Sequence, residues 1–156
     1  MAFKRVLPLL LALLLVGCGR QVLIPSSFSG EASQWVVLTP ASDEADLSDG
    51  LTAVIHNRSD RQFGYSYAFS LETEQNGGWY QLPLRKDFPG FPEPAIFLPG
   101  NGQTAFNFDL DRTFGPLEPG RYRILCDGVL LQDNGATEKQ HLLLAFTVTE
   151  GGTLQP

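Results

Sequence analysis

Apolar and polar residues alternate over most of the chain beyond residue 33, which is the pattern of half-buried β-strands. The clearest case is the segment 65–72, where aromatic or aliphatic residues occupy every second position. Similar short runs occupy residues 35–39, 51–56, 79–82, 96–98, 104–108, 122–131 and 142–148. No long segment has the helical period. About seven short strands separated by turns predict an all-β fold, an antiparallel β-sandwich.

Turn residues divide these runs. Asn76-Gly77-Gly78 predicts a tight turn that joins strands 65–72 and 79–82 as a hairpin. Residues 83–94 are rich in proline, phenylalanine and charge, which indicates a long ordered loop rather than a strand.

The first eighteen residues have a different pattern. Lys4 and Arg5 precede an almost wholly apolar run, 6–16, that is too short to cross about 30 Å of hydrocarbon as a helix. It ends in Leu15-Val16-Gly17-Cys18, which fits a lipobox at every position and resembles the signal of bacterial lipoproteins. The resemblance implies that diacylglycerol is attached to Cys18, which becomes the new N-terminus. Two acyl chains are sufficient for stable anchoring.

These patterns divide the chain into a signal peptide (1–17), a lipidated tether (18–32), one β-domain (33–150) and a flexible tail (151–156). We expect the tether to be a solvated spacer because it is rich in serine and glycine. The short apolar run Val22-Leu23-Ile24 is the exception, and it fits either contact with the lipid surface or an edge strand. The expected location is the extracytoplasmic face of the cell membrane, or of an outer membrane if the host has one.

The charge of the chain restricts its partners. The formal charge is −6, and removal of Lys4 and Arg5 with the signal leaves nine basic against seventeen acidic residues, a charge of −8. An acidic surface argues against nucleic acid and anionic headgroups as ligands. We therefore expect the membrane to be reached through the lipid anchor, and the partner to be an envelope protein or a cell-wall polymer.

Little in the sequence points to catalysis, a metal or a cofactor. With Cys18 acylated, Cys126 is left alone and we interpret it as a buried, inert thiol. His56 and His141 are the only histidines, and the acidic loop 43–49 does not have the spacing of a calcium loop. No nucleophile elbow, zinc-protease motif or phosphate loop occurs. We expect no enzyme activity, no metal and no cofactor.

The candidate contact residues are aromatic. Phe88 and Phe91 lie in the proline-rich loop 88–94, which could hold them exposed for recognition. The alternative is that both rings fold back over one end of the sandwich. Trp79 and Tyr80 point to opposite sides of their strand, so one of them is expected in the core and the other partly exposed.

Several segments together resemble bacterial immunoglobulin-like (Ig-like) domains. They are the strand and turn 51–60, the Trp-Tyr strand 78–83, the turn Leu98-Pro99-Gly100 with strand 106–110, and the Leu-x-Pro-Gly-x-Tyr-x-Ile segment 117–124. The resemblance implies an Ig-like β-sandwich outside the cytoplasm that acts as a binding or interaction module, with no catalytic residues. It also implies a tyrosine corner in which the Tyr122 hydroxyl bonds to nearby backbone. Two alternatives remain: a protease inhibitor that uses loop 88–94, and a carbohydrate-binding module that uses Trp79 or Tyr80.

Overall fold

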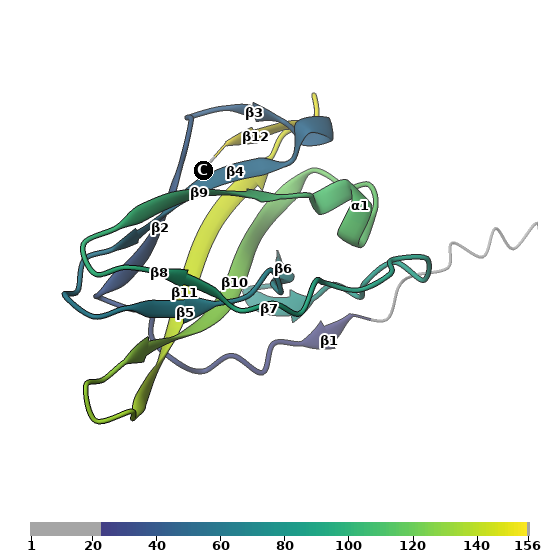
Figure 1. The fold of residues 1–156 in the computed structure, drawn as a ribbon. Coiled ribbons are helices and arrows are strands. Elements are labelled where there is room, and N and C mark those ends of the chain that lie inside the picture. Colours follow the sequence, from purple (N-terminus) through teal and green to yellow (C-terminus); the bar gives the residue numbers. More distant parts are fainter. Residues whose placement is uncertain (1–22, 156) are drawn as a thin grey trace, which may run out of the picture.

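The structure is a computed structural model that describes residues 23–155. Within this range the strands form two facing antiparallel sheets, a sandwich with one short helix at one end (Figure 1). The fold class predicted from the sequence, an antiparallel β-sandwich, is confirmed. No helix in the described part of the chain is both long and apolar enough to cross a membrane.

The smaller sheet has the order β2-β4-β9. Its strands are β2 (Val36–Pro40), β4 (Leu51–Asn57) and β9 (Gln103–Phe108). Every second residue of β4 is buried, from Leu51 to Asn57, as the alternation in the sequence predicts.

The larger sheet has the order β1-β7-β6-β10-β11-β12-β3, with β5 paired to β10 and β8 paired to β5. The bounds of its strands are β1 (Ile24–Pro25), β3 (Ala45–Asp46), β5 (Phe63–Tyr65), β6 (Ser70–Gln75), β7 (Gly78–Gln81), β8 (Ile96–Leu98), β10 (Gly120–Leu131), β11 (Thr137–Val148) and β12 (Thr153–Gln155). A short 3₁₀ turn, η1 (Leu47–Asp49), follows β3.

The long hairpin of β10 and β11 forms the centre of this sheet. The two strands pair without interruption from Gly120 opposite Val148 to Leu131 opposite Thr137. Tyr122, Ile124 and Leu142 point from it into the core. The core lies between the sheets, and its largest fully buried side chains include Phe63, Phe108 and Phe146.

The predicted strand 65–72 is interrupted in the structure. β5 pairs with Gly128–Leu130 of β10, and β6 pairs with residues 122–125 of the same strand, so residues 66–69 form a break between two collinear pieces. Phe69, within this break, stacks edge-on against Phe108 and Phe114. Packing of one aromatic ring into the end of the sandwich therefore replaces strand pairing at this point.

The sequence pattern gave no sign of helix α1 (Leu110–Phe114). Its first turn is capped by Asp109, whose carboxylate accepts a hydrogen bond from the Arg112 amide at 3.2 Å. The side chains of Leu110 and Phe114, at the two ends of this helix, are buried. A helix of five residues is too short for the 3.6-residue period to be visible in a sequence.

The predictions of a solvated spacer before the domain and a flexible tail after it are wrong for the described residues, because both ends pair with the larger sheet. At the C-terminus, β12 pairs with β11 and β3, and the Leu154 side chain is completely buried. At the N-terminus, Ile24–Pro25 forms the edge strand β1, so the second of the two alternatives for the run 22–24 applies to Ile24. Residues 26–33 then continue across the larger sheet.

Candidate functional site

The N-terminal segment, residues 24–33, lies on the outer face of the larger sheet, the face directed away from the core. β1 pairs with β7, and the amide of Ser26 donates to the carbonyl oxygen of Trp79 at 2.8 Å. At its other end, the amide of Ser33 donates to the carbonyl oxygen of His141 at 2.7 Å. The segment therefore crosses the sheet from the β7 edge to β11, as Figure 1 shows.

A buried ion pair holds the middle of this segment, and we call it the Glu72 clamp (Glu72, Arg123 and Ser26). The Glu72 carboxylate accepts hydrogen bonds from Ser26 Oγ at 2.5 Å and from Arg123 Nε at 2.7 Å. Only 3% of Glu72 is exposed. Because the two charged groups satisfy each other and also bind the hydroxyl, the clamp meets the condition under which a buried charge is tolerated.

Two aromatic rings enclose the guanidinium of this clamp. Its carbon lies 4.4 Å from the ring centre of Trp79 and 5.5 Å from that of Phe28. Trp79 is thus half-buried, with Arg123 over its ring. The cation–π contacts join the N-terminal segment, β7 and β10 at one point.

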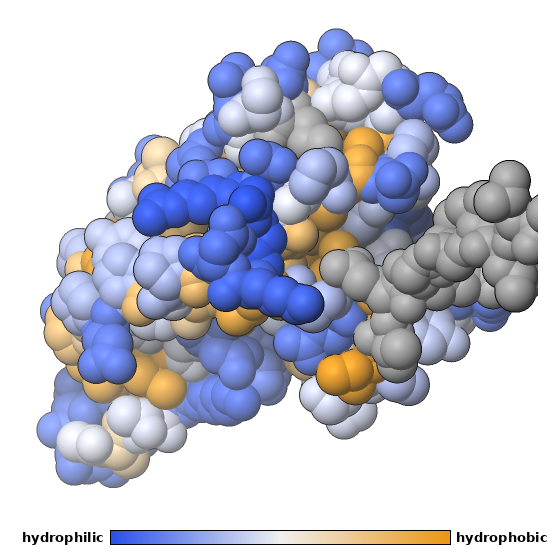
Figure 2. All heavy atoms as spheres, turned by 90° about the vertical axis from the view of Figure 1, so that its right-hand side faces the viewer, coloured by the Kyte–Doolittle hydropathy of each residue, from blue (hydrophilic) through white to orange (hydrophobic). Residues whose placement is uncertain are grey.

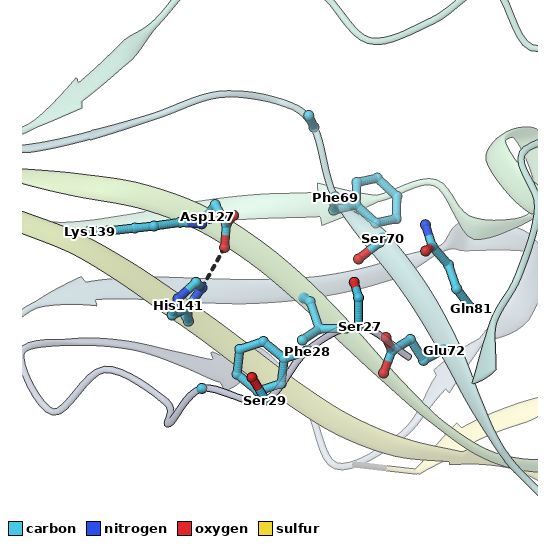
Figure 3. A pocket seen from close by; sticks show the side chains of 13 residues that line it. Ser27, Phe28, Ser29, Phe69, Ser70, Glu72, Gln81, Asp127, Lys139 and His141 are labelled. Atoms are coloured by element: carbon cyan, nitrogen blue, oxygen red, sulfur yellow. Dashed lines mark hydrogen bonds and ion pairs between the residues drawn. The ribbon is translucent and has the colours of Figure 1, made fainter. Parts of the chain in front are cut away.

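Beside the clamp is a cavity of about 540 Å³, the outer-face pocket (Figure 3). One wall is formed by residues 27–30. The others come from residues 68–72, from Gln81 of β7, and from β10 and β11, which contribute Asp127, Lys139 and His141.

The charges in the pocket are already paired. Asp127 accepts from His141 Nδ1 at 2.7 Å and lies 3.1 Å from Lys139 Nζ. Partial burial raises the pKa of Asp127, but the hydrogen bonds from His141 and Lys139 outweigh it and hold the pKa below its usual value. The other imidazole nitrogen of His141, Nε2, lies close to Gly30; a Cβ atom on residue 30 would be 3.5 Å from this nitrogen. The pocket therefore presents a polar surface with compensated charges.

The four predicted contact residues do not come together on one surface. Trp79 is on the outer face, whereas Tyr80 lies on the opposite face of the sheet, beside Leu117 and Tyr122. Phe88 packs on Phe91 with ring centres 4.9 Å apart. Phe91 in turn packs on Phe69 at 5.2 Å, so the loop 88–94 folds back over one end of the sandwich.

The remaining candidate residues are separated. His56 bonds Thr39 within the smaller sheet at 2.8 Å, whereas His141 lies on β11 of the larger sheet. Within residues 23–155 no three or more histidine, cysteine or carboxylate side chains are grouped so as to hold a metal ion. Burial raises the pKa of the Cys126 thiol to about 12, with a smaller contribution from Asp127, so the thiol is protonated at neutral pH. Cys18 and the signal 1–17 lie outside the described residues.

A hydrogen bond from a tyrosine side chain fixes the start of β10. The hydroxyl of Tyr122 donates to the carbonyl oxygen of Glu118, four residues upstream, at 2.7 Å. This is the geometry of a tyrosine corner, which in Ig-like sandwiches fixes the strand after a turn between sheets.

The sequence from residue 32 to residue 140 matches the model of the bacterial Ig-like domain. The chain belongs to this family. No curated protein matches it. The resemblance carried by segments 51–60, 78–83, 98–110 and 117–124 thus falls inside the match.

The match locates the clamp relative to the Ig-like domain. Glu72 and Arg123 belong to matched strands, whereas Ser26 and Phe28 precede residue 32. The outer-face pocket is therefore formed where the segment before the Ig-like match lies on the Ig-like sheet. The sequence alone does not identify Glu72, Arg123 and Asp127 as site residues, because charged residues on half-buried strands have the same pattern as ordinary solvent-facing positions.

Proposed function

We propose that this chain is an extracytoplasmic module that is anchored by lipid at Cys18 and binds a partner in its outer-face pocket, without enzyme activity. The outer-face pocket is the observation that carries the proposal. It is open, polar and built from the N-terminal segment together with the Ig-like sheet.

The pairing of its charges supports binding over catalysis. A general base or nucleophile needs a free, activated group. Here Glu72 is occupied by Arg123 and Ser26, and Asp127 by His141 and Lys139. Hydrogen-bonding groups that are held rigidly by one another suit the recognition of a polar partner.

The anchor has its own test. Cells grown with an alkyne-tagged fatty acid should incorporate the tag into the wild-type protein and not into Cys18→Ser. Equal labelling of both proteins, or none, would refute the anchor.

Binding is tested by photo-crosslinking in whole cells. A photoreactive amino acid at Ser29, in the wall of the pocket, should capture an envelope partner. The same amino acid at Phe97, which is 53% exposed on β8, is the matched control. Capture from both positions alike would show that the pocket is not the contact surface.

A second candidate is that the partner is a hydroxyl-rich polymer such as a cell-wall glycan. The lining favours it, since Ser27, Ser29, Ser70 and Gln81 surround the pocket beside the ring of Phe28. Retention on purified peptidoglycan that is lost in Gln81→Ala, and kept in Gln75→Ala on the same hairpin, would support it. Trp79 is then a structural residue of the clamp rather than a sugar platform.

A further inference from the structure

The distance from the proposed anchor to the folded domain is short. Five residues separate Cys18 from Ile24, where β1 begins. A fully extended chain spans at most about 3.5 Å per residue, so Ile24 lies within about 20 Å of the lipidated residue. This limit depends on the sequence alone.

The domain is also held firmly at this point. Ile24 and Pro25 pair with Gln81 and Tyr80 of β7, and the Glu72 clamp follows at Ser26. The anchor therefore acts on one edge of the sandwich, which favours orientations that bring this edge close to the lipid.

An exposed apolar patch lies at this edge. Ile24 and Leu84 are 64% and 48% exposed, the first and fourth most exposed of the large hydrophobic residues in the described chain. Both line one hollow of about 180 Å³, together with Leu82, Pro83 and Phe91. Figure 1 shows the start of β1 and the β7–β8 loop on the same side of the molecule. In Figure 2, which faces that side, apolar surface is visible among hydrophilic residues.

We infer that this patch, Ile24 with Leu84, rests on the phospholipid bilayer and sets the orientation of the domain. The inference rests on the proposed lipid anchor. The charge of −8 opposes approach to anionic headgroups, so the anchor and apolar contact must provide the attraction. Next to Leu84 the repulsion is weaker, because Arg85 and Lys86 follow it; Arg85 pairs with Asp87 at 2.8 Å, and among residues 23–155 Lys86 forms no ion pair.

The orientation leaves the opposite side of the sandwich free. β5, β8 and the tip of the β10–β11 hairpin lie on the side away from β1 in Figure 1. Phe97 on β8 is therefore a matched control, with an exposed fraction of 53% beside 48% for Leu84.

The test places a polarity-sensitive fluorophore on single cysteines. Native lipidated protein carrying Leu84→Cys or Phe97→Cys is labelled and reconstituted into vesicles of phosphatidylethanolamine and phosphatidylglycerol. The side chain of Cys126 is only partly exposed and burial raises the pKa of its thiol, and Cys18 is acylated, so neither should react appreciably with the label. The label at position 84 should be quenched several-fold more by lipid-borne quenchers than the label at 97, and its emission should shift to shorter wavelength.

Three controls keep the outcomes separate. Vesicle flotation and the mass of the N-terminal peptide report the anchor, and Ile24→Cys supplies a second label if Leu84→Cys fails to fold. If the protein is acylated and floats but labels at 24 and 84 behave like the label at 97, the orientation is refuted and the anchor stands. If the protein is neither acylated nor vesicle-bound, the anchor and the orientation fall together.

Discussion

Removing the carboxylate of Glu72 should strongly destabilise the fold. In Glu72→Ala the Arg123 guanidinium, whose side chain is 14% exposed, loses the only carboxylate that it contacts among residues 23–155. Breaking a buried pair by removing one partner costs about 3–5 kcal/mol. The cation–π contacts with Trp79 and Phe28 remain, so we expect a loss near the lower limit, about 3 kcal/mol in the free energy of unfolding.

A matched control lies two residues further along the same strand. Glu74 pairs with Arg121 at 3.0 Å, but these side chains are 30% and 60% exposed. Exposed pairs contribute about 0–1 kcal/mol, so Glu74→Ala should cost no more than about 1 kcal/mol. The comparison isolates burial, since both substitutions remove a glutamate from the same face of β6.

The assay is urea unfolding followed by far-UV circular dichroism, on the chain produced without residues 1–18. Trp79 fluorescence is a poor probe because this ring contacts the clamp itself. Hydrogen exchange gives an independent readout, because Glu72→Ala should also speed exchange at the Ser26 and Ser33 amides. Equal losses for Glu72→Ala and Glu74→Ala, with unchanged exchange at both serines, would refute the clamp as the element that holds the N-terminal segment.

Three further outcomes test the packing. Gly128→Ala should lower stability by at least about 2 kcal/mol in thermal or urea unfolding, since the new Cβ would lie 2.2 Å from the buried Phe63 ring, whereas Gly151→Ala, with its nearest neighbour at 3.8 Å, should be nearly neutral. Tyr122→Phe should cost about 1 kcal/mol through loss of the bond to Glu118, and no loss would show that the corner is dispensable. Cys126 should resist a thiol reagent at pH 8 and react in urea; rapid labelling of the folded protein would contradict its burial.

The alternation of apolar residues predicted most of the sandwich. β4 and the strand through Tyr122 could be predicted because apolar and polar residues alternate along them, with the apolar positions directed into the core. The break at 66–69 was not readable, because Ser66 to Phe69 continue the alternation while the structure uses Phe69 to fill the end of the core. The burial of Leu154 could not be predicted from its neighbours in the sequence either, because it depends on pairing with β3, more than a hundred residues earlier.

The docked N-terminal segment shows a more general limit of hydrophobic patterning. The outer face of β6, β10 and β11 is polar, with charges paired across strands, such as Glu74 with Arg121 and Asp127 with Lys139. A segment that covers such a face gains from hydroxyls and amides rather than from apolar side chains, so a serine-rich sequence is a suitable cover. The hydrogen bonds that attach this segment to the domain join Ser26 to Glu72 and Ser33 to Gln140, which are 46 and 107 residues apart in the sequence. Composition predicts a spacer here because a polar cover and a solvated linker have the same composition, and only the partner strand distinguishes them.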